Sequence, residues 1–453
     1  MRRGEITGRS DVTFWRYTPL LLERLAGARY PLATLASLVS EEPEYGAGAR
    51  AVERVSPSQP RYIRITDFGD DGIEPNHTFA APDPVEEACA LERDDLLFAR
   101  SGATVGKTYL HEDTAEPAIF AGYCIRFRIA RTRATPRFVY WFTKTRIYEL
   151  WVLATQRPAG QPNINKEEYK ALQLPLPGDL KEQETLVAAM DAARAQRLAK
   201  MAQADALLAG LDAFLLSTLG LSAPPTPKTV FAILNGDLTG MLNPDRYRAM
   251  SLEKHLPFDG HVGDVGELLE ARSSPEREGP EELWDWIRID DLPNQPWQVE
   301  ALRTEPGKNI CGTFFEVREN DLLIARLGPT ILNAKFVLCP KLKRRTVASS
   351  EFLVLRCNPG WRPEAALWIL RTRLYRDIMY LRSRGGTPSR FRLDGADLAS
   401  IPFPKLAAPV QSAITAEVSK GHETSRRLRA EAEAEWQAAK RHFEEQLLTP
   451  ART

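Results

Sequence analysis

Residues 101–108 (SGATVGKT) resemble a phosphate-binding loop, because a Gly-Lys-Thr triplet follows a predicted buried strand. A P-loop requires the pattern G-x-x-x-x-G-K-[ST], whose backbone amides and lysine surround a phosphate. Here Ser101 occupies the position of the first glycine, and Gly102 leaves the loop one residue short. A related stretch, residues 326–333 (RLGPTILN), has no Gly-Lys-Thr. The pattern therefore argues against nucleotide binding and leaves open a turn at which Lys107 faces a phosphate of another kind.

No other residues form a catalytic or metal-binding pattern. The sequence has no H-E-x-x-H, G-x-S-x-G or paired Cys/His spacing. It also has no glycine-rich strand-turn-helix for adenosylmethionine, and residues 243–246 (NPDR) lack the aromatic that would stack a flipped base. The five cysteines show no C-x-x-C pair and read as reduced thiols. We predict a protein without cofactor, metal or catalytic activity of its own.

Two runs of cations are the clearest sign of a ligand. Lys plus Arg and Asp plus Glu both number 60, so any nucleic-acid signal must be local. Residues 126–148 contain seven cations and no acid, and residues 371–392 contain seven cations and one acid. Both runs lead into a Gly/Pro loop, and a solvated helix face would explain either one alone. Because the run occurs twice in a neutral chain, we predict phosphate-facing surfaces that include Arg131 and Arg133.

The loops after these runs, residues 157–165 and 384–390, contain side chains suited to base edges. Arginine pairs with guanine and asparagine or glutamine with adenine in the major groove. The two loops differ in sequence although their surroundings match, as expected for readers of two different DNA sequences. The predicted base-reading residues are Arg157, Gln161, Asn163 and Asn165 in the first loop and Arg384, Thr387, Ser389 and Arg390 in the second.

An internal repeat supplies the elements that position these residues. Residues 62–67 (YIRITD) match 286–291 (WIRIDD), and residues 94–100 (DDLLFAR) match 320–326 (NDLLIAR). Further matches follow in nearly the same register. They are Trp141 with Trp368, residues 145–148 (TRIY) with 372–375 (TRLY), the Gly160/Pro162 loop with Gly386/Pro388, residues 174–177 (LPLP) with 401–404 (IPFP), and Gln183 with Gln411. The offset stays between 224 and 228 throughout, so the chain is a tandem duplication.

Each half reads as an α+β domain with a mixed sheet. Alternating or continuous apolar strands come first, then a helix, the polar loop and a short strand that ends in proline. Residues 222–227 (SAPPTP) form a proline-rich linker between the halves.

Two long stretches, residues 181–219 and 409–448, carry apolar residues at steps of three and four without internal proline. We predict two long helices that pack as a coiled coil, each stripe facing its sister helix. The predicted boundaries are residues 1–178 and 222–404 for the domains, and residues 179–221 and 405–453 for the helices.

In this order and duplication, the motifs resemble the specificity subunits of type I restriction–modification enzymes. Residues 44–49 (EYGAGA) are similar to the family's Y-G-x-x-A opening, and D-L-L-x-A-R-x-G with Gly106-Lys107 to another recurrent feature. The second half lacks the opening and the Gly-Lys pair, and its long helix contains Gly421. The resemblance implies two target recognition domains in pseudo-twofold symmetry and antiparallel packing of the two long helices. It adds these expected DNA contacts: Tyr45, Arg100 and Lys107 in the first half, and Arg326, Lys335 and Arg382 in the second.

The same resemblance implies a non-catalytic, cytoplasmic subunit that reads a bipartite site on double-stranded DNA. Its expected partners are two DNA methyltransferase subunits and the restriction motor subunits, with no membrane. One alternative is a specificity subunit of a methyltransferase-only or fused restriction system. Two others belong to different classes: a coiled-coil scaffold, and a nucleotide-driven enzyme using residues 106–108.

Overall fold

The computed structural model describes residues 11–73, 77–157, 161–222, 244–273, 281–293, 302–310, 312–387 and 390–448, with residues 296, 298 and 299. Most of the proline-rich linker, Gly160, Cys311, Pro388 and Ser389 lie outside the described residues. The chain forms two compact units. Unit 1 contains Met1–Lys200 and Ala430–Thr453, and unit 2 contains Met201–Arg429. Each unit thus combines one half of the repeat with part of the other half's long helix.

Unit 1 is built around a four-stranded antiparallel sheet with the order β2-β9-β6-β7. Strands β6 and β9 are fully buried, as expected from the continuous apolar run LLFA. Two-stranded pairs β1–β10, β3–β5 and the parallel pair β4–β8 surround it. The strands are β1 (Leu32–Thr34), β2 (Glu44–Tyr45), β3 (Arg50–Val52), β4 (Arg61–Ile63), β5 (Ala81–Asp83), β6 (Leu96–Ala99), β7 (Thr108–Leu110), β8 (Ala118–Phe120), β9 (Cys124–Phe127) and β10 (Gln173–Pro175).

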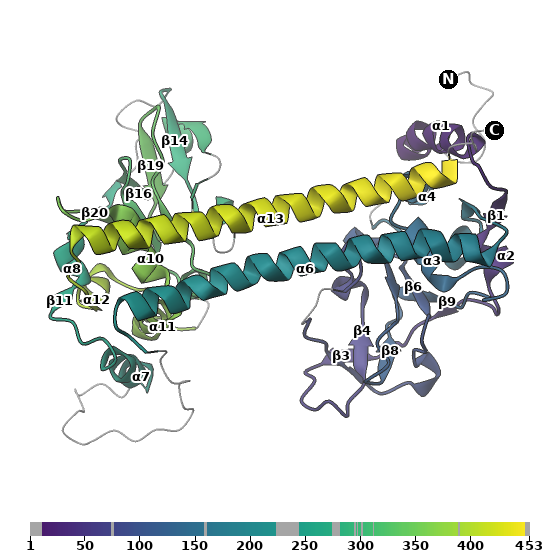
Figure 1. Cartoon of the computed structure of the whole chain (residues 1–453), viewed down its shortest axis with the longest axis horizontal. Coiled ribbons are helices and arrows are strands. Elements are labelled where there is room, and N and C mark those ends of the chain that lie inside the picture. Colours follow the sequence, from purple (N-terminus) through teal and green to yellow (C-terminus); the bar gives the residue numbers. More distant parts are fainter. Residues whose placement is uncertain are drawn as a thin grey trace. The chain divides into compact units, whose positions relative to one another are not determined.

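Helices α3 and α4 of unit 1 carry buried aromatic side chains. The long helix α6 runs beside α3, and the end of α13 (Ala408–Leu448) lies at the start of α4 (Figure 1). Threonine residues begin both short helices: Thr135 and Thr145 each accept a hydrogen bond from a backbone amide three residues later. The helices that begin in this half are α1 (Val12–Ala26), α2 (Leu35–Leu38), α3 (Pro136–Phe142), α4 (Arg146–Thr155), α5 (Lys166–Lys170) and the long α6 (Leu180–Thr218).

Unit 2 repeats this plan. Its four-stranded sheet β12-β20-β17-β18 has the strand order of the sheet in unit 1, and its parallel pair β14–β19 corresponds to β4–β8. The strands are β11 (Gly260–His261), β12 (Gly266–Leu268), β13 (Arg272–Ser273), β14 (Leu283–Ile287), β15 (Arg303–Pro306), β16 (Thr313–Glu316), β17 (Leu322–Ala325), β18 (Phe336–Leu338), β19 (Thr346–Ser349), β20 (Phe352–Cys357) and β21 (Pro402–Phe403).

The helices of the second half follow the same order (Figure 1). They are α7 (Pro244–Glu253), α8 (Val262–Val265), α9 (Gly328–Leu332), α10 (Pro363–Arg371), α11 (Arg373–Arg382), α12 (Gly395–Ala399) and the long α13 (Ala408–Leu448). The α+β fold class and the tandem duplication predicted from the sequence are confirmed.

Single hydrogen bonds also repeat between the units. Asp94 and Asn320 both have a positive φ, 73° and 70°, at the turn before the central strand. The next residue of each turn, Asp95 or Asp321, accepts an arginine Nε–H at 2.8 Å, from Arg128 or Arg356. An aspartate or asparagine tolerates this left-handed backbone because its short side chain bonds locally. The shared D-L-L-x-A-R motif therefore encodes a turn, a buried strand and an internal ion pair.

The long helices run antiparallel within each unit. In unit 1 Arg29 contacts both the start of α6 and the end of α13, because its guanidinium lies 3.5 Å from Glu182 and its amide donates to the Leu447 carbonyl at 2.8 Å. Further along, Lys200 of α6 pairs with Glu435 of α13 at 2.6 Å. In unit 2 Ser425 donates a hydrogen bond to the Ala204 carbonyl at 3.2 Å, and Leu211 lies beside Gly421. Rising numbers on one helix meet falling numbers on the other, as predicted.

The apolar stripes of these helices do more than face the sister helix. Met190, Trp436, Phe443 and Leu447 belong to the core of unit 1, whereas Leu211, Leu215, Ile414 and Val418 belong to the core of unit 2. The prediction that each stripe faces its sister helix was therefore incomplete. The reason is that each helix end also covers the domain beside it, which buries more apolar surface than a two-helix seam.

Candidate nucleic-acid interface

Arg100 lies at the centre of the candidate site in unit 1, immediately after β6. Its amide donates to the Tyr123 carbonyl at 3.0 Å, and its carbonyl accepts from the Ile164 amide at 2.8 Å. The Gly102 amide donates to the Pro162 carbonyl at 3.0 Å. The turn after β6 and the polar loop are therefore fixed to each other. Because the Arg100 Nε is buried without a hydrogen-bond partner among the described residues, a donor of this guanidinium is unused.

Tyr45 lies beside Arg100. The Arg100 guanidinium carbon is 4.7 Å from the Tyr45 ring centre, and Lys166 Nζ is 6.0 Å from it. The Lys166 amide also donates to the Tyr45 hydroxyl at 3.4 Å. Tyr45 remains 42 % exposed, so its ring and two cations form a solvent-facing cluster. Sequence reasoning missed Lys166, because nothing in the chain order places it next to Tyr45.

Gly46 follows Tyr45 because the backbone there touches its neighbour. A Cβ at this position would lie 2.4 Å from the carbonyl oxygens of Phe120 and Ala121. No side chain fits at that distance, so the Y-G pair marks a close approach of two segments. That approach holds the Tyr45 strand against the segment that leads to Tyr123.

The loop of unit 1 that is predicted to read bases, residues 157–165, contains some side chains that hold the fold and others that are exposed to solvent. Asn165 caps α5: its side chain accepts from the Glu168 amide, and the Glu168 carboxylate accepts from the Asn165 amide. Arg157 is exposed and pairs with Glu168 at 2.9 Å. Gln161 is exposed, and Asn163 pairs through its backbone with Ser101. Asn165 thus has a structural role, whereas Arg157 and Gln161 present donors to solvent.

Lys107 faces another part of unit 1. Its ammonium pairs with Asp70 at 2.9 Å, which lowers the pKa of that carboxyl. Gly102 and Gly106 have φ values of +75° and +86°, and Thr108 begins strand β7. A P-loop presents phosphate to the first turn of a helix, which this segment does not begin. The near match to a P-loop is therefore a turn between two strands.

The basic runs are not continuous surfaces. Arg126 is 5 % exposed and pairs with Glu44, and Lys144 and Arg371 are buried. Arg131 and Arg133 are exposed, but Arg131 pairs with Asp94 and Arg133 donates to the Ser37 carbonyl at 2.6 Å. The predicted phosphate-facing surfaces therefore do not include every cation of the two runs, because several of these cations hold the fold together.

Unit 2 repeats the frame around Arg326. Its amide donates to the Glu351 carbonyl at 3.1 Å, and its carbonyl accepts from the Leu393 amide at 2.8 Å. The Gly328 amide donates to the Phe391 carbonyl at 2.8 Å. The Arg326 Nε is also buried without a partner in the described part of the chain. Both halves thus hold one arginine between a central strand and a polar loop.

The other predicted residues of unit 2 differ in whether their side chains are bonded within the protein or exposed. Arg382 is bound to Glu253, the Asp397 carbonyl and Ser400, and Lys335 donates to the Ile289 carbonyl at 3.2 Å. Arg384 is exposed and makes two bonds to Asp397, at 2.8 and 3.1 Å. Thr387 and Arg390 are exposed at the loop. Ser389 lies outside the described residues.

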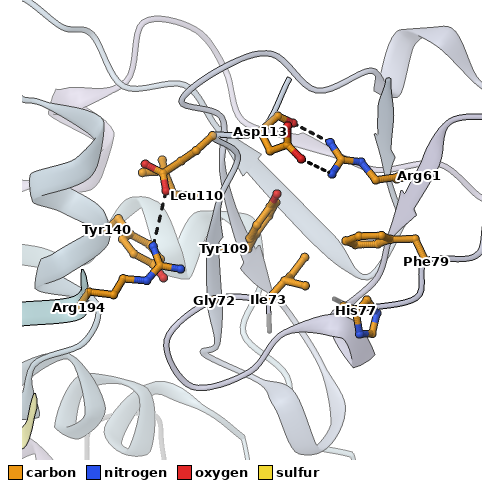
Figure 2. Close-up of a pocket in the computed structure, with 11 residues that line it drawn as sticks. Arg61, Gly72, Ile73, His77, Phe79, Tyr109, Leu110, Asp113, Tyr140 and Arg194 are labelled. Carbon is orange, nitrogen blue, oxygen red and sulfur yellow. Dashed lines mark hydrogen bonds and ion pairs between the residues drawn. The ribbon is translucent and has the colours of Figure 1, made fainter. Parts of the chain in front are cut away.

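A separate cavity of about 280 Å³ in unit 1 is lined by polar and aromatic side chains (Figure 2). Figure 2 shows the Arg61–Asp113 pair on one side of Tyr109 and Arg194 beside Tyr140 on the other. Arg61 pairs with Asp113 at 2.8 Å and donates to two backbone carbonyls. These contacts join β4 to the segment before β8, and we assign them a structural role.

Comparisons with known proteins give the fold a context. No family model matches the sequence, and no curated protein does. A chain from a study of complex assembly and conformational transition of the type I R-M system is similar over 93 % of this chain and 97 % of its own. Its TM-score is 0.52 and its sequence identity 13 %. This similarity shows a shared fold. Separately, none of the described helices is long and apolar enough to cross a membrane.

Two further solved structures are similar to this chain over most of its length. The HsdS subunit from Thermoanaerobacter tengcongensis has a TM-score of 0.35 at 16 % identity, covering 92 % of this chain and 95 % of its own. The S subunit of the type I restriction-modification system from M. genitalium has a TM-score of 0.44 at 11 % identity, covering 94 % and 97 %. The fold shared with the chain from the type I R-M system, at a TM-score of 0.52, agrees with the predicted resemblance at the level of the fold.

Proposed function

We propose that this chain is the DNA-recognition subunit of a type I restriction–modification system and reads a site in two parts. The observation that carries the proposal is the duplicated frame of Arg100 and Arg326. Each arginine joins a central strand to a polar loop, and each has a buried Nε without a partner in the described chain. Neither guanidinium makes an ion pair or a side-chain hydrogen bond among the described residues, so its terminal N–H groups suit an external acceptor.

In the first domain, residues 1–178, we assign base reading to Arg157, Gln161 and Asn163. Tyr45, Arg100 and Lys166 form the positive, aromatic surface beside them. Such a surface suits phosphate oxygens and sugar faces, whereas the amide and guanidinium groups of the loop suit base edges. In the second domain, residues 222–404, we assign the corresponding roles to Arg326, Thr387 and Arg390 and the neighbouring Ser389.

The catalytic activities belong to partner subunits in this proposal. No residue set in the sequence suggests adenosylmethionine binding or activation of water, so the purified chain is expected neither to methylate nor to cut DNA. Two methyltransferase subunits would dock on the pair of long helices, and motor subunits would join in the complete enzyme. Reversing the charges of Arg426, Arg427 and Arg429 together should weaken co-purification with the methyltransferase, whereas unchanged assembly would contradict docking at this face.

The alternatives make different demands on the chain. A specificity subunit of a methyltransferase-only or fused system would use the same interface, and the neighbouring genes distinguish it. A coiled-coil scaffold would not need a duplicated arginine frame that leads into two different polar loops. A nucleotide-driven enzyme would need a phosphate loop at residues 101–108, where the structure instead has a turn between strands.

The test is a comparison of the methylomes of the host and of a strain lacking this gene. We expect the deletion to remove methylation from one split motif, with a fixed stretch of unread bases between its parts. A deletion strain that carries a variant with the residue 157–165 loop replaced should methylate a motif changed in one part only. A continuous lost motif would refute the two-reader proposal, and an unchanged methylome would refute the assignment to a modification system.

A further inference from the structure

A cavity of about 460 Å³ lies in unit 1 between the turn after β6, helix α4 and helix α13. Its wall includes Gly106 and Lys107, the residues that made the sequence resemble a P-loop. An adjoining cavity of about 590 Å³ shares Lys144, Arg146 and Lys440 with it. This place lies apart from the Tyr45–Arg100 cluster, whose residues do not line either cavity.

Most charges around the cavity are already balanced. Lys107 pairs with Asp70 at 2.9 Å, and Arg146 with Glu149 at 2.8 Å. Asp71 accepts the indole N–H of Trp436 at 2.7 Å and lies 3.5 Å from Arg197 and 4.0 Å from Lys440. These acids are therefore occupied by the protein's own cations.

Lys144 is the exception. It is only 9 % exposed, and within the described residues no carboxylate lies within 4.0 Å of its ammonium. Its one hydrogen bond goes to the Thr108 carbonyl at 3.2 Å, and the Tyr140 ring centre lies 4.6 Å away. An ammonium has three donors, so Lys144 retains donor capacity beside the cavity. A buried cation without a counter-charge is unfavourable unless something pairs with it.

The second half has a cation with more protein partners at this position. Arg371 occupies the place of Lys144 in the repeat and lies over the Trp368 ring at 4.7 Å. Its guanidinium donates to the carbonyls of Pro296, Ala334 and Phe336, the last two at 3.0 and 2.5 Å. The fold thus accepts a buried cation here in both halves. Lys144 has a single carbonyl partner where Arg371 has three.

We propose that this cavity binds a small organic anion, a phosphate ester or a carboxylate, whose charged group pairs with Lys144 and Lys440. The apolar part of the ligand lies against Val105, Val152 and Leu153, which line the same cavity. A volume of this size is that of a small-molecule site rather than of a single ion. The proposal is independent of DNA recognition.

The titration of Lys144 provides the readout. Burial lowers its pKa to about 7, and a bound anion would raise the pKa because an opposite charge favours the ammonium form. The full-length protein would be acetylated over a range of pH, and the reactivity of each lysine followed by mass spectrometry. The probes are phenyl phosphate, benzoate, inorganic phosphate and the neutral control phenol, with the exposed Lys181 as internal reference.

We expect phenyl phosphate or benzoate to protect Lys144 and to raise the midpoint of its titration by about one pH unit or more. The stronger of these two probes identifies the anionic group. Phenol should leave Lys144 unchanged, and inorganic phosphate should protect it less because it lacks the apolar part. If neither organic anion changes the reactivity of Lys144, the proposed site is refuted. If inorganic phosphate protects Lys144 equally well, the proposed apolar contact is refuted.

Two variants complete the test by calorimetry. Lys144→Met keeps a similar shape without the charge and should weaken binding of the better probe by about tenfold or more. Lys144→Arg keeps the charge and should retain more of the binding. Wild-type affinity in a folded Lys144→Met variant contradicts the proposal. If that variant does not fold, the titration of Lys144 in the wild-type protein still tests the proposed anion site.

Discussion

At the scale of single residues, two glutamines show how the repeat is held together. Gln183 accepts from the Thr135 amide at 2.9 Å and donates to the Pro177 carbonyl at 2.8 Å. Gln411 accepts from the Arg362 amide at 2.6 Å and donates to the Leu406 carbonyl at 2.9 Å. Both side chains are buried at the start of a long helix. The side-chain amide of each glutamine therefore links the start of its long helix to the turn before a domain helix.

Replacing Gln183 with alanine leaves a buried amide and a buried carbonyl without partners. We expect the free energy of unfolding to fall by roughly 2–4 kcal/mol, measured by chemical denaturation. Gln196→Ala, at an exposed site of the same helix, should change it by less than about 0.5 kcal/mol. Equal effects of the two substitutions would show that the hydrogen bonds of Gln183 do not stabilise the folded protein.

At the scale of elements, each long helix supplies an acid to the domain of the other half. Glu444 of α13 accepts from the amides of Arg146 and Ile147, at 2.6 and 3.4 Å, at the start of α4. Asp212 of α6 accepts from the Arg373 amide at 2.9 Å, at the start of α11. A carboxylate is favoured at a helix N-terminus, where amides lack partners within the helix. The matching T-R-[IL]-Y motifs are therefore helix starts capped from the opposite half.

Glu444→Ala removes the acceptor of two amides at the start of α4, where Thr145 still binds the Tyr148 amide, and should lower the free energy of unfolding by about 1–2 kcal/mol. Glu444→Gln keeps an oxygen acceptor and should cost less. The exposed neighbour Glu445, changed to alanine, serves as the control. A loss for Glu444→Ala no larger than for Glu445→Ala would contradict the capping role.

The pH dependence of the Glu444→Gln variant adds a second readout. Burial raises the pKa of Glu444 above its ordinary 4.5, so the folded state holds this proton longer than the unfolded state. Wild-type stability is thus lost as the pH rises from about 4.5 through the folded pKa. The amide does not titrate, so the stability of Glu444→Gln relative to the wild type should increase over this window.

At the scale of the whole molecule, the proposal treats the two long helices as the spacer between two DNA readers. Readers on one face of a duplex engage half-sites about one helical turn, roughly 34–36 Å, apart. The spacer length would then follow from the helices and the half-site sequences from the loops. These two properties should change independently.

Inserting four residues after Ala202, with a matched insertion after Ala430, adds roughly 6 Å to each helix. Both positions lie where the helices pass from one unit to the other. Methylome sequencing should then show a spacer changed by about one or two base pairs with both half-sites kept, given a rise of about 3.4 Å per base pair. Methylation of the original motif with its original spacer would exclude this role of the helices.

The loop provides the reverse experiment. Single changes at Arg157, Gln161 or Asn163 should relax one half-site, each true base contact being worth about 1–3 kcal/mol of discrimination. A change at Arg131 or Arg133 should weaken binding to all sequences alike and flatten its salt dependence. Electrophoretic mobility shifts with matched and mismatched duplexes separate the two outcomes. Sequence-independent weakening at all three loop residues would contradict base reading.

The sequence by itself determined the duplication, the α+β class and the two long amphipathic helices. These follow from order, spacing and periodicity, which are properties of the chain and of its local geometry. Only the tertiary structure decided which cations are available. Lys144 and Arg371 are buried and Lys166 joins Tyr45, because burial depends on segments far away in the chain. Periodicity likewise marked the apolar face of each long helix, but not the domain that covers its ends.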